Sequence, residues 1–190
     1  MFYSLLNRRE FLKRAGYFLF FSASLSSIPL LRLLFPEKEK LIRPPGAVVE
    51  ERFLAVCMRC GKCVEACPTR IIKPLKSGFA AGTPYVDFSQ GEICTSCMKC
   101  TEACPTNALM KIGKEKLDIG TAGIDYDRCN RCFICFDYCP VEAFRVEDGW
   151  PKVIEEKCIG CNICSSVCPI SPTAITVKPE GSYRPEWSPP

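Results

Sequence analysis

The sequence predicts an α+β fold in which short strands and helical turns surround repeated cysteine loops. All sixteen cysteines of the 190 residues fall into four copies of the spacing C-x-x-C-x-x-C-x-x-x-C-P. Three copies follow a short extended segment, and each of these three leads into a Pro-x-x-Ala tail and an apolar residue typical of a strand. The chain therefore repeats one short unit of extended segment, cysteine loop, helical turn and strand.

The cysteine spacing is that of ligands to [4Fe–4S] clusters. Each cluster needs four thiolates, so sixteen cysteines match four clusters with none left over. In two-cluster ferredoxins the fourth cysteine of each motif binds the neighbouring cluster. The proline after each fourth cysteine has a fixed φ and no N–H, so we expect it to turn the chain out of the ligand loop. The motifs are Cys57, Cys60, Cys63 and Cys67; Cys94, Cys97, Cys100 and Cys104; Cys129, Cys132, Cys135 and Cys139; and Cys158, Cys161, Cys164 and Cys168.

A disulfide framework and zinc sites are the two competing interpretations of these cysteines. Disulfide scaffolds scatter cysteines to join distant segments, whereas each motif here lies within eleven residues. Zinc sites with four cysteines usually pair two C-x-x-C segments across a long loop, and the third cysteine in every motif argues against them. The repeated spacing therefore favours iron–sulfur clusters.

The connection between the third and fourth motifs is the shortest and carries a hairpin signal. Asp148 and Gly149 lie between two strand-like segments, so these motifs should form one two-cluster ferredoxin-like unit, residues 119–180. The first two motifs then form the other unit, residues 44–118, in tandem with it. The tandem ligand sets are Cys57, Cys60, Cys63 and Cys104; Cys94, Cys97, Cys100 and Cys67; Cys129, Cys132, Cys135 and Cys168; and Cys158, Cys161, Cys164 and Cys139. A nested arrangement, which pairs motif one with four and two with three, stays open.

Residues 1–43 resemble a twin-arginine signal or membrane anchor helix followed by a linker. The run from Asn7 to Lys13, Asn-Arg-Arg-Glu-Phe-Leu-Lys, departs from the usual pattern only in Asn7, and a largely apolar stretch follows from Ala15 to Phe35. Export of the folded protein suits clusters that are assembled inside the cell. No A-x-A cleavage site follows, which favours an uncleaved helix, while cleavage and an ordinary membrane helix stay open. The positive N-terminal flank places the cysteine motifs outside the cytoplasm.

Composition excludes several classes of function. The chain has no histidine and no G-x-G-x-x-G or G-x-x-x-x-G-K-[ST] run, so imidazole chemistry and a nucleotide site are not expected. We therefore expect an electron carrier without a substrate site of its own. Four oxidised clusters with their thiolates add about −8 charges. The formal charge of +4 thus becomes negative, which argues against a nucleic-acid partner.

Three further expectations concern packing. The Pro-rich tail, residues 181–190, should be disordered, with Trp187 as a candidate for docking to a partner. Phe133, Phe136 and Tyr138 lie between ligands of the third motif and should shield a cluster from water. Units of roughly 60 residues bury too little apolar surface to be stable alone, so the chain without iron should be unfolded or molten.

Several segments resemble the NapG/MauM group of exported ferredoxin-type proteins. They are Cys57-Met-Arg-Cys-Gly-Lys-Cys-Val-Glu-Ala-Cys67-Pro-Thr, Gly82-Thr-Pro-Tyr-Val-Asp87 and Cys104-Pro-Thr-Asn-Ala-Leu109, together with the twin-arginine region. The resemblance implies electron transfer on the periplasmic side of the cytoplasmic membrane. The implied partners are a membrane-bound Fe–S quinol dehydrogenase, a periplasmic reductase of the nitrate-reductase type or a c-type cytochrome, and the twin-arginine translocase. Two alternatives are a maturation factor for an exported metalloenzyme, as in methylamine utilization, and a subunit of an exported hydrogenase or molybdenum reductase.

Overall fold

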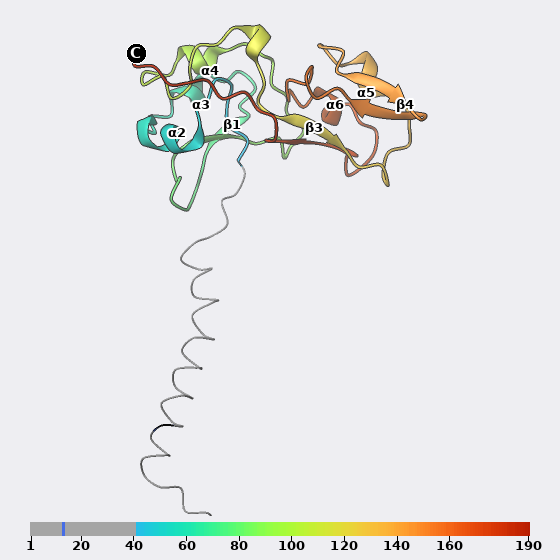
Figure 1. Cartoon of the computed structure of the whole chain (residues 1–190), viewed down its shortest axis with the longest axis horizontal. Coiled ribbons are helices and arrows are strands. Elements are labelled where there is room, and N and C mark those ends of the chain that lie inside the picture. Colours follow the sequence, from blue (N-terminus) through green and yellow to red (C-terminus); the bar gives the residue numbers. More distant parts are fainter. Residues whose placement is uncertain (1–12, 14–40) are drawn as a thin grey trace, which may run out of the picture. The chain divides into compact units, whose positions relative to one another are not determined.

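The computed structural model describes residue 13 and residues 41–190. Apart from Lys13, the expected twin-arginine motif and the apolar stretch after it lie outside the described residues. Residues Lys40–Pro190 form one compact unit (Figure 1). Within the part of the chain that is described, no helix is long and apolar enough to cross a membrane.

Short helices and two-stranded antiparallel sheets make up the compact unit, as the α+β prediction requires. The elements before residue 118 are α2 (Glu50–Val56), α3 (Lys62–Ala66), β1 (Ile72–Pro74), β2 (Pro84–Val86), α4 (Lys99–Glu102) and the 3-10 helix η1 (Lys114–Lys116). Those after it are β3 (Thr121–Ile124), α5 (Ile134–Asp137), β4 (Phe144–Glu147), β5 (Trp150–Val153), α6 (Ile163–Ser166) and β6 (Ile175–Lys178). Each of α3, α4, α5 and α6 contains the third cysteine of one motif.

The strands of the second half enclose the third and fourth motifs. β4 pairs with β5 in the hairpin expected from the sequence, with Phe144 opposite Val153. Asp148 and Gly149 at its turn both have positive φ, which is the backbone of a type I′ turn and matches the twist of the strands. β3, before the third motif, pairs with β6, after the fourth motif. The two motifs therefore lie between one closing ladder and one internal hairpin.

The first half repeats this arrangement with less regular pairing. β1 and β2, which follow the first motif and precede the second, form an antiparallel hairpin with Ile72 opposite Val86. An isolated bridge between Ala47 and Leu109 joins the segment before the first motif to the segment after the second. This bridge corresponds to the β3–β6 ladder. The same topology therefore occurs twice, which agrees with two ferredoxin-like units in tandem.

The two halves are not separated by a flexible connection. Leu117 and Ile119, in the segment that joins them, are 4% and 0% exposed and belong to the larger apolar core around Phe53 and Leu109. Cys161 of the fourth motif is also part of that core, although the rest of its half has a smaller core of its own around Ile175. The first core therefore extends into the second half.

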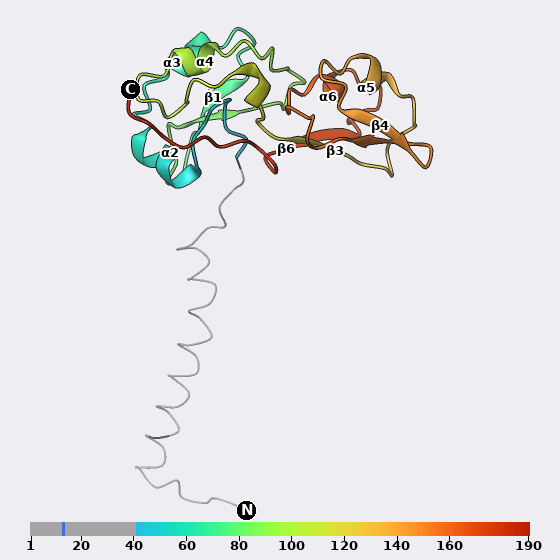
Figure 2. The same ribbon diagram turned by 45° about the horizontal axis from the view of Figure 1, so that its top comes forward.

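The structure contradicts the expected disorder of the Pro-rich tail. After β6 the chain returns to the first half, where its C-terminus lies in both views (Figures 1 and 2). The Trp187 indole donates a hydrogen bond to the Thr106 carbonyl at 3.1 Å, and the Arg52 guanidinium lies 4.1 Å from the centroid of the Trp187 ring. Trp187 thus packs within its own chain, so the tail is an ordered strap over the first half.

Candidate iron–sulfur centres

Each cysteine loop has the same backbone, which explains how three cysteines two residues apart can face one point. The residue before the second cysteine and the residue after it are both left-handed in every motif. A left-handed residue on either side of the second cysteine curls the loop tightly, and a short helix then begins that carries the third cysteine. The residues are Arg59, Ser96, Arg131 and Gly160 before the second cysteine, and Gly61, Met98, Phe133 and Asn162 after it.

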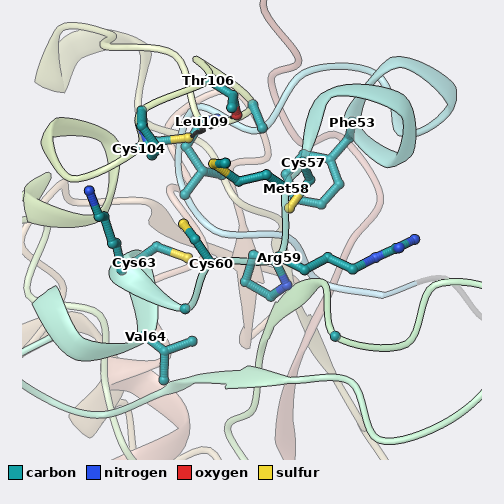
Figure 3. Close-up of a pocket in the computed structure, with 16 residues that line it drawn as sticks. Phe53, Cys57, Met58, Arg59, Cys60, Cys63, Val64, Cys104, Thr106 and Leu109 are labelled. Carbon is teal, nitrogen blue, oxygen red and sulfur yellow. Dashed lines mark hydrogen bonds between the residues drawn. The ribbon is translucent and has the colours of Figure 1, made fainter.

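The structure places the sixteen cysteines around four cavities. Three cysteines of each set come from one loop, and the fourth comes from the end of the paired motif; Figure 3 shows this for the first cavity. We name the sets site 1 (Cys57, Cys60, Cys63, Cys104), site 2 (Cys94, Cys97, Cys100, Cys67), site 3 (Cys129, Cys132, Cys135, Cys168) and site 4 (Cys158, Cys161, Cys164, Cys139). All sixteen cysteines lie in described residues, and none of them forms a disulfide.

These groupings are those of the tandem arrangement. A nested arrangement would bring Cys168 to the loop of Cys57, but Cys104 lies there and Cys168 lines the cavity of site 3. Cys164 lines the cavities of both site 3 and site 4, so these two sites are direct neighbours. The assignment of individual cysteines to individual clusters stays a prediction, which this grouping favours.

The surroundings of the sulfur atoms suit thiolate ligands. Backbone amides donate to the fourth cysteines Cys104 and Cys139, from Leu109 at 3.4 Å and Ala143 at 3.3 Å. Thr69 and Thr106, two residues after Cys67 and Cys104, place their hydroxyls 3.6 Å and 3.8 Å from the sulfurs. Donors of this kind stabilise negative charge on sulfur and tune a bound cluster. Each cavity is lined by the four cysteines of its set, and hydrogen-bond donors reach a sulfur in every set, so the four cavities fit [4Fe–4S] clusters.

Burial controls the protonation of the thiols. Burial, and then the neighbouring cysteines, raises the pKa of Cys63 to about 11 and that of Cys164 to about 12. Burial also raises the pKa of Cys67, but hydrogen bonds from Thr69 and from backbone amides outweigh it and leave that pKa below its usual value. Buried thiols without metal are therefore neutral, and cluster binding must release their protons.

The four sites differ in exposure. Cys60 in site 1 and Cys132 in site 3 are exposed, whereas no cysteine of site 2 or site 4 is. Met58, beside Cys57, is 61% exposed at the edge of site 1. Sites 1 and 3 are therefore the two with an exposed cysteine, whereas the least buried cysteines of sites 2 and 4 are only partly exposed.

The aromatic residues of the third motif only partly match the shielding prediction. Phe133 lines the cavity of site 3 and contacts Phe136 edge to face, with ring centroids 5.5 Å apart. Phe136 in turn stacks on Phe144 at 5.5 Å. Tyr138, by contrast, is 58% exposed and lines none of the four cavities. Position between two ligands therefore does not by itself decide which way a side chain points.

The sequence gives no indication of a role for Arg43, which contacts residues that line the cavity of site 1. Its guanidinium is 1% exposed, forms an ion pair with Glu50 and donates to the Thr83 hydroxyl at 3.0 Å and to the Pro84 carbonyl at 2.7 Å. It also lies 4.7 Å from the centroid of the Phe53 ring. Phe53 and Pro84 line the cavity of site 1. The Gly-Thr-Pro-Tyr-Val-Asp segment, residues 82–87, thus supplies two hydrogen-bond acceptors for the Arg43 guanidinium.

Comparison with known proteins agrees with this chemistry. A family model described as a 4Fe-4S dicluster domain matches residues 56–108 and 93–143, and a second model with the same description matches residues 122–177. The match at 93–143 spans motifs two and three, whose cysteines share no cavity, so it reflects the repeat rather than a ligand set. The chain is thus an iron–sulfur protein with 4Fe-4S dicluster domains, and its sixteen cysteines hold four [4Fe–4S] clusters.

Curated relatives of the chain include ferredoxin-type proteins named NapG and MauM. The chain is 36% identical over 110 residues to the ferredoxin-type protein NapG of Escherichia coli, covering 52% of this chain and 48% of the relative. It is 34% identical over 114 residues to the methylamine utilization ferredoxin-type protein MauM of Methylobacillus flagellatus, covering 54% and 49%. The chain therefore spans about half the length of the curated relatives it matches.

One solved structure with a matching chain is the formate dehydrogenase–heterodisulfide reductase–formylmethanofuran dehydrogenase complex of Methanospirillum hungatei. The identity is 25%, over 66% of this chain and 53% of the other, with a TM-score of 0.27. This likeness is too low to support an argument about arrangement.

Proposed function

We propose that this electron-transfer protein works on the outer face of the cytoplasmic membrane. There it passes electrons between a membrane-bound Fe–S quinol dehydrogenase and either a periplasmic reductase of the nitrate-reductase type or a c-type cytochrome. Each bound [4Fe–4S] cluster can take up and release one electron. The chain's own residues hold the clusters, set their environment and present them to partners.

The observation that carries this proposal is the distribution of exposed cysteines. A carrier that exchanges electrons with two partners needs two accessible sites, and Cys60 and Cys132 are exposed in two different halves of the chain. The remaining cysteines are partly or fully buried, which limits access of water to the inner sites. Electrons would then enter and leave through the loops of Cys60 and Cys132.

The proposed location rests on the N-terminal sequence. Arg8 and Arg9 stand in a twin-arginine pattern before an apolar stretch. Twin-arginine export would carry the folded protein with its clusters across the membrane. Replacing Arg8 and Arg9 together by lysine should leave the protein inside the cell, and fractionation of cells into cytoplasm, membrane and periplasm measures this. Full export of the variant would contradict the proposed route.

The proposed partners can be tested with one cysteine variant and a matched control. Cys60→Ser removes an exposed ligand of site 1, and Glu65→Ser changes an exposed residue of the following helix α3. We expect membrane vesicles supplied with quinol to reduce the wild-type protein and Glu65→Ser, with electrons passing on to the reductase. Cys60→Ser should interrupt this transfer, and unchanged transfer would contradict the proposal.

The MauM relatives support a second candidate function, because their names associate them with methylamine utilization. On this alternative the protein would assist the maturation of an exported metalloenzyme. The two candidate functions, electron carrier and maturation factor, can be distinguished by adding Cys60→Ser to a partner enzyme that has already matured. A maturation factor is no longer needed at that stage, so enzyme activity would survive, whereas a carrier is needed in every turnover.

A further inference from the structure

The loop of the fourth motif touches the first half of the chain directly. The Cys94 amide donates to the Cys161 carbonyl at 2.9 Å. Asn162, the next residue, is 3% exposed and donates from its side-chain amide to the Glu92 carbonyl at 2.8 Å. Cys94 begins the loop of site 2, and Cys161 is the second cysteine of the loop of site 4. These two loops are thus hydrogen-bonded to each other across the two halves.

Close backbone packing accompanies these hydrogen bonds. Gly160 lies so close to Gly120 that a Cβ at Gly160 would be 2.5 Å from the Gly120 carbonyl oxygen. The Ile119 amide donates to the Ile159 carbonyl at 3.3 Å, and Ile159 and Ile163 pack on the core of the first half. Figures 1 and 2 both show α6, which follows this loop, on the side of α5 that faces the first half. The contact is therefore a packed junction and not a chance approach of two loops.

We propose that the Asn162 side chain and the Cys94–Cys161 backbone bond form the junction that holds sites 2 and 4 next to each other, with Asn162 as its positioning residue. The spatial order of the sites is then 1, 2, 4, 3, which differs from their order in the sequence. The proposal rests on the ligand sets assigned above.

The other neighbours in this order follow from shared residues. Site 1 and site 2 exchange their fourth cysteines, Cys67 and Cys104, and site 3 and site 4 exchange Cys139 and Cys168. Sites 2 and 4, which have no exposed cysteine, meet at the junction. Sites 1 and 3, which have one each, lie at the two ends. A path of neighbouring sites from site 1 to site 3 therefore has to pass through the junction.

Asn162→Gly tests the junction with little effect on the backbone conformation of the loop. Asn162 has a φ of 69°, a conformation that glycine adopts freely, and the first motif has Gly61 at the same position with a φ of 76°. The substitution removes the amide and keeps the backbone. Asn107→Gly is the matched control. Asn107 is also left-handed, at 53°, and its side-chain amide also donates to a carbonyl, that of Ser188 at 3.2 Å, away from the junction.

Two measurements on the anaerobically purified, fully loaded protein separate the outcomes. Reduced [4Fe–4S] clusters are paramagnetic, so EPR reports the spin–spin interaction between neighbouring sites. In Asn162→Gly we expect loss of the interaction between sites 2 and 4, retention of the interaction within each pair, and full iron content. Asn107→Gly should match the wild type. A wild-type pattern of interactions in Asn162→Gly would overturn the proposal.

Hydrogen exchange provides the second measurement, and its wild-type arm needs no variant. In the wild type, the Cys94 amide should exchange far more slowly than the amides of the exposed residues 89–91, which are hydrogen-bonded only within their own turn, and Asn162→Gly should lose this protection. Fast exchange at Cys94 in the wild type would overturn the junction. A protected junction in a protein that exchanges no electrons with membrane partners would instead contradict only the proposed function.

Discussion

Trp187→Ala should loosen the C-terminal strap and expose site 1. The substitution removes the hydrogen bond from the indole to the Thr106 carbonyl, worth about 1 kcal/mol. It also removes the stacking of Arg52 on the ring, worth about 0.5–1 kcal/mol at a partly exposed position. Loss of the half-buried ring from the core of the first half adds about 1.5 kcal/mol, roughly half the usual cost for a fully buried aromatic. The sum is an upper bound, because a released strap regains conformational entropy, so we expect a loss of about 1–3 kcal/mol.

The functional consequence should appear at site 1. Thr106 lines that cavity and lies two residues after Cys104 of the same set, so we expect a loosened strap to admit water and dioxygen to one cluster of the four. The assays are anaerobic denaturant unfolding of the loaded protein and the rate at which its visible absorbance bleaches in air. We expect a lower unfolding midpoint and a faster phase that accounts for one cluster.

Tyr183→Ala is the control for this prediction. Tyr183 lies in the same strap, and its side chain is exposed. The variant therefore removes an aromatic ring from the strap but leaves the indole hydrogen bond and the Arg52 contact in place. Equal unfolding midpoints and equal bleaching rates for Trp187→Ala and Tyr183→Ala would refute the reasoning that the indole holds the strap on site 1.

Three further predictions concern the support of the sites. Glu50→Gln leaves the buried Arg43 without its carboxylate and should lower the free energy of unfolding by about 2 kcal/mol. This loss is smaller than for a fully buried ion pair, because Glu50 is 40% exposed. Denaturant unfolding measures it, and a variant as stable as the wild type would contradict the prediction. Thr69→Val removes a hydroxyl from the Cys67 sulfur and should lower the reduction potential of one cluster by about 40 mV, the equivalent of about 1 kcal/mol for one electron. A redox titration monitored by EPR measures this, and unchanged potentials would contradict it. Anaerobic removal of iron with a chelator should abolish cooperative thermal unfolding, because the small apolar cores cannot stabilise the fold without the clusters. A cooperative unfolding transition that survives iron removal would contradict this.

Local features of this protein follow from the sequence because short-range geometry decides them. The spacing of the cysteines predicts the ligand loops, and Asp148-Gly149 predicts the β4–β5 hairpin, since a two-residue turn with positive φ needs such residues. The number of cysteines predicts the number of clusters, because every cluster needs four thiolates. These inferences need no knowledge of how distant segments meet.

Long-range features of this protein depend on tertiary packing. Tandem and nested pairing use the same loops and the same spacing, so only the fold brings Cys104 rather than Cys168 to the loop of Cys57. Arg43 and Trp187 look like parts of a linker and a tail, because their partners, Thr83 and Thr106, lie far away in the sequence. Residues 181–190 are polar and Pro-rich, and this composition predicts disorder unless a surface elsewhere in the chain receives them.

What the sequence by itself determined is the chemistry at each cysteine loop and the repeat that multiplies it. What only the tertiary structure decided is which loops are neighbours: the contact of Cys94 with Cys161, the close approach of Gly120 and Gly160, and the resulting order of the four sites. The physical reason is that a ligand loop is closed by local backbone conformation, whereas the contact between two loops depends on the free energy of packing segments that are far apart in the chain.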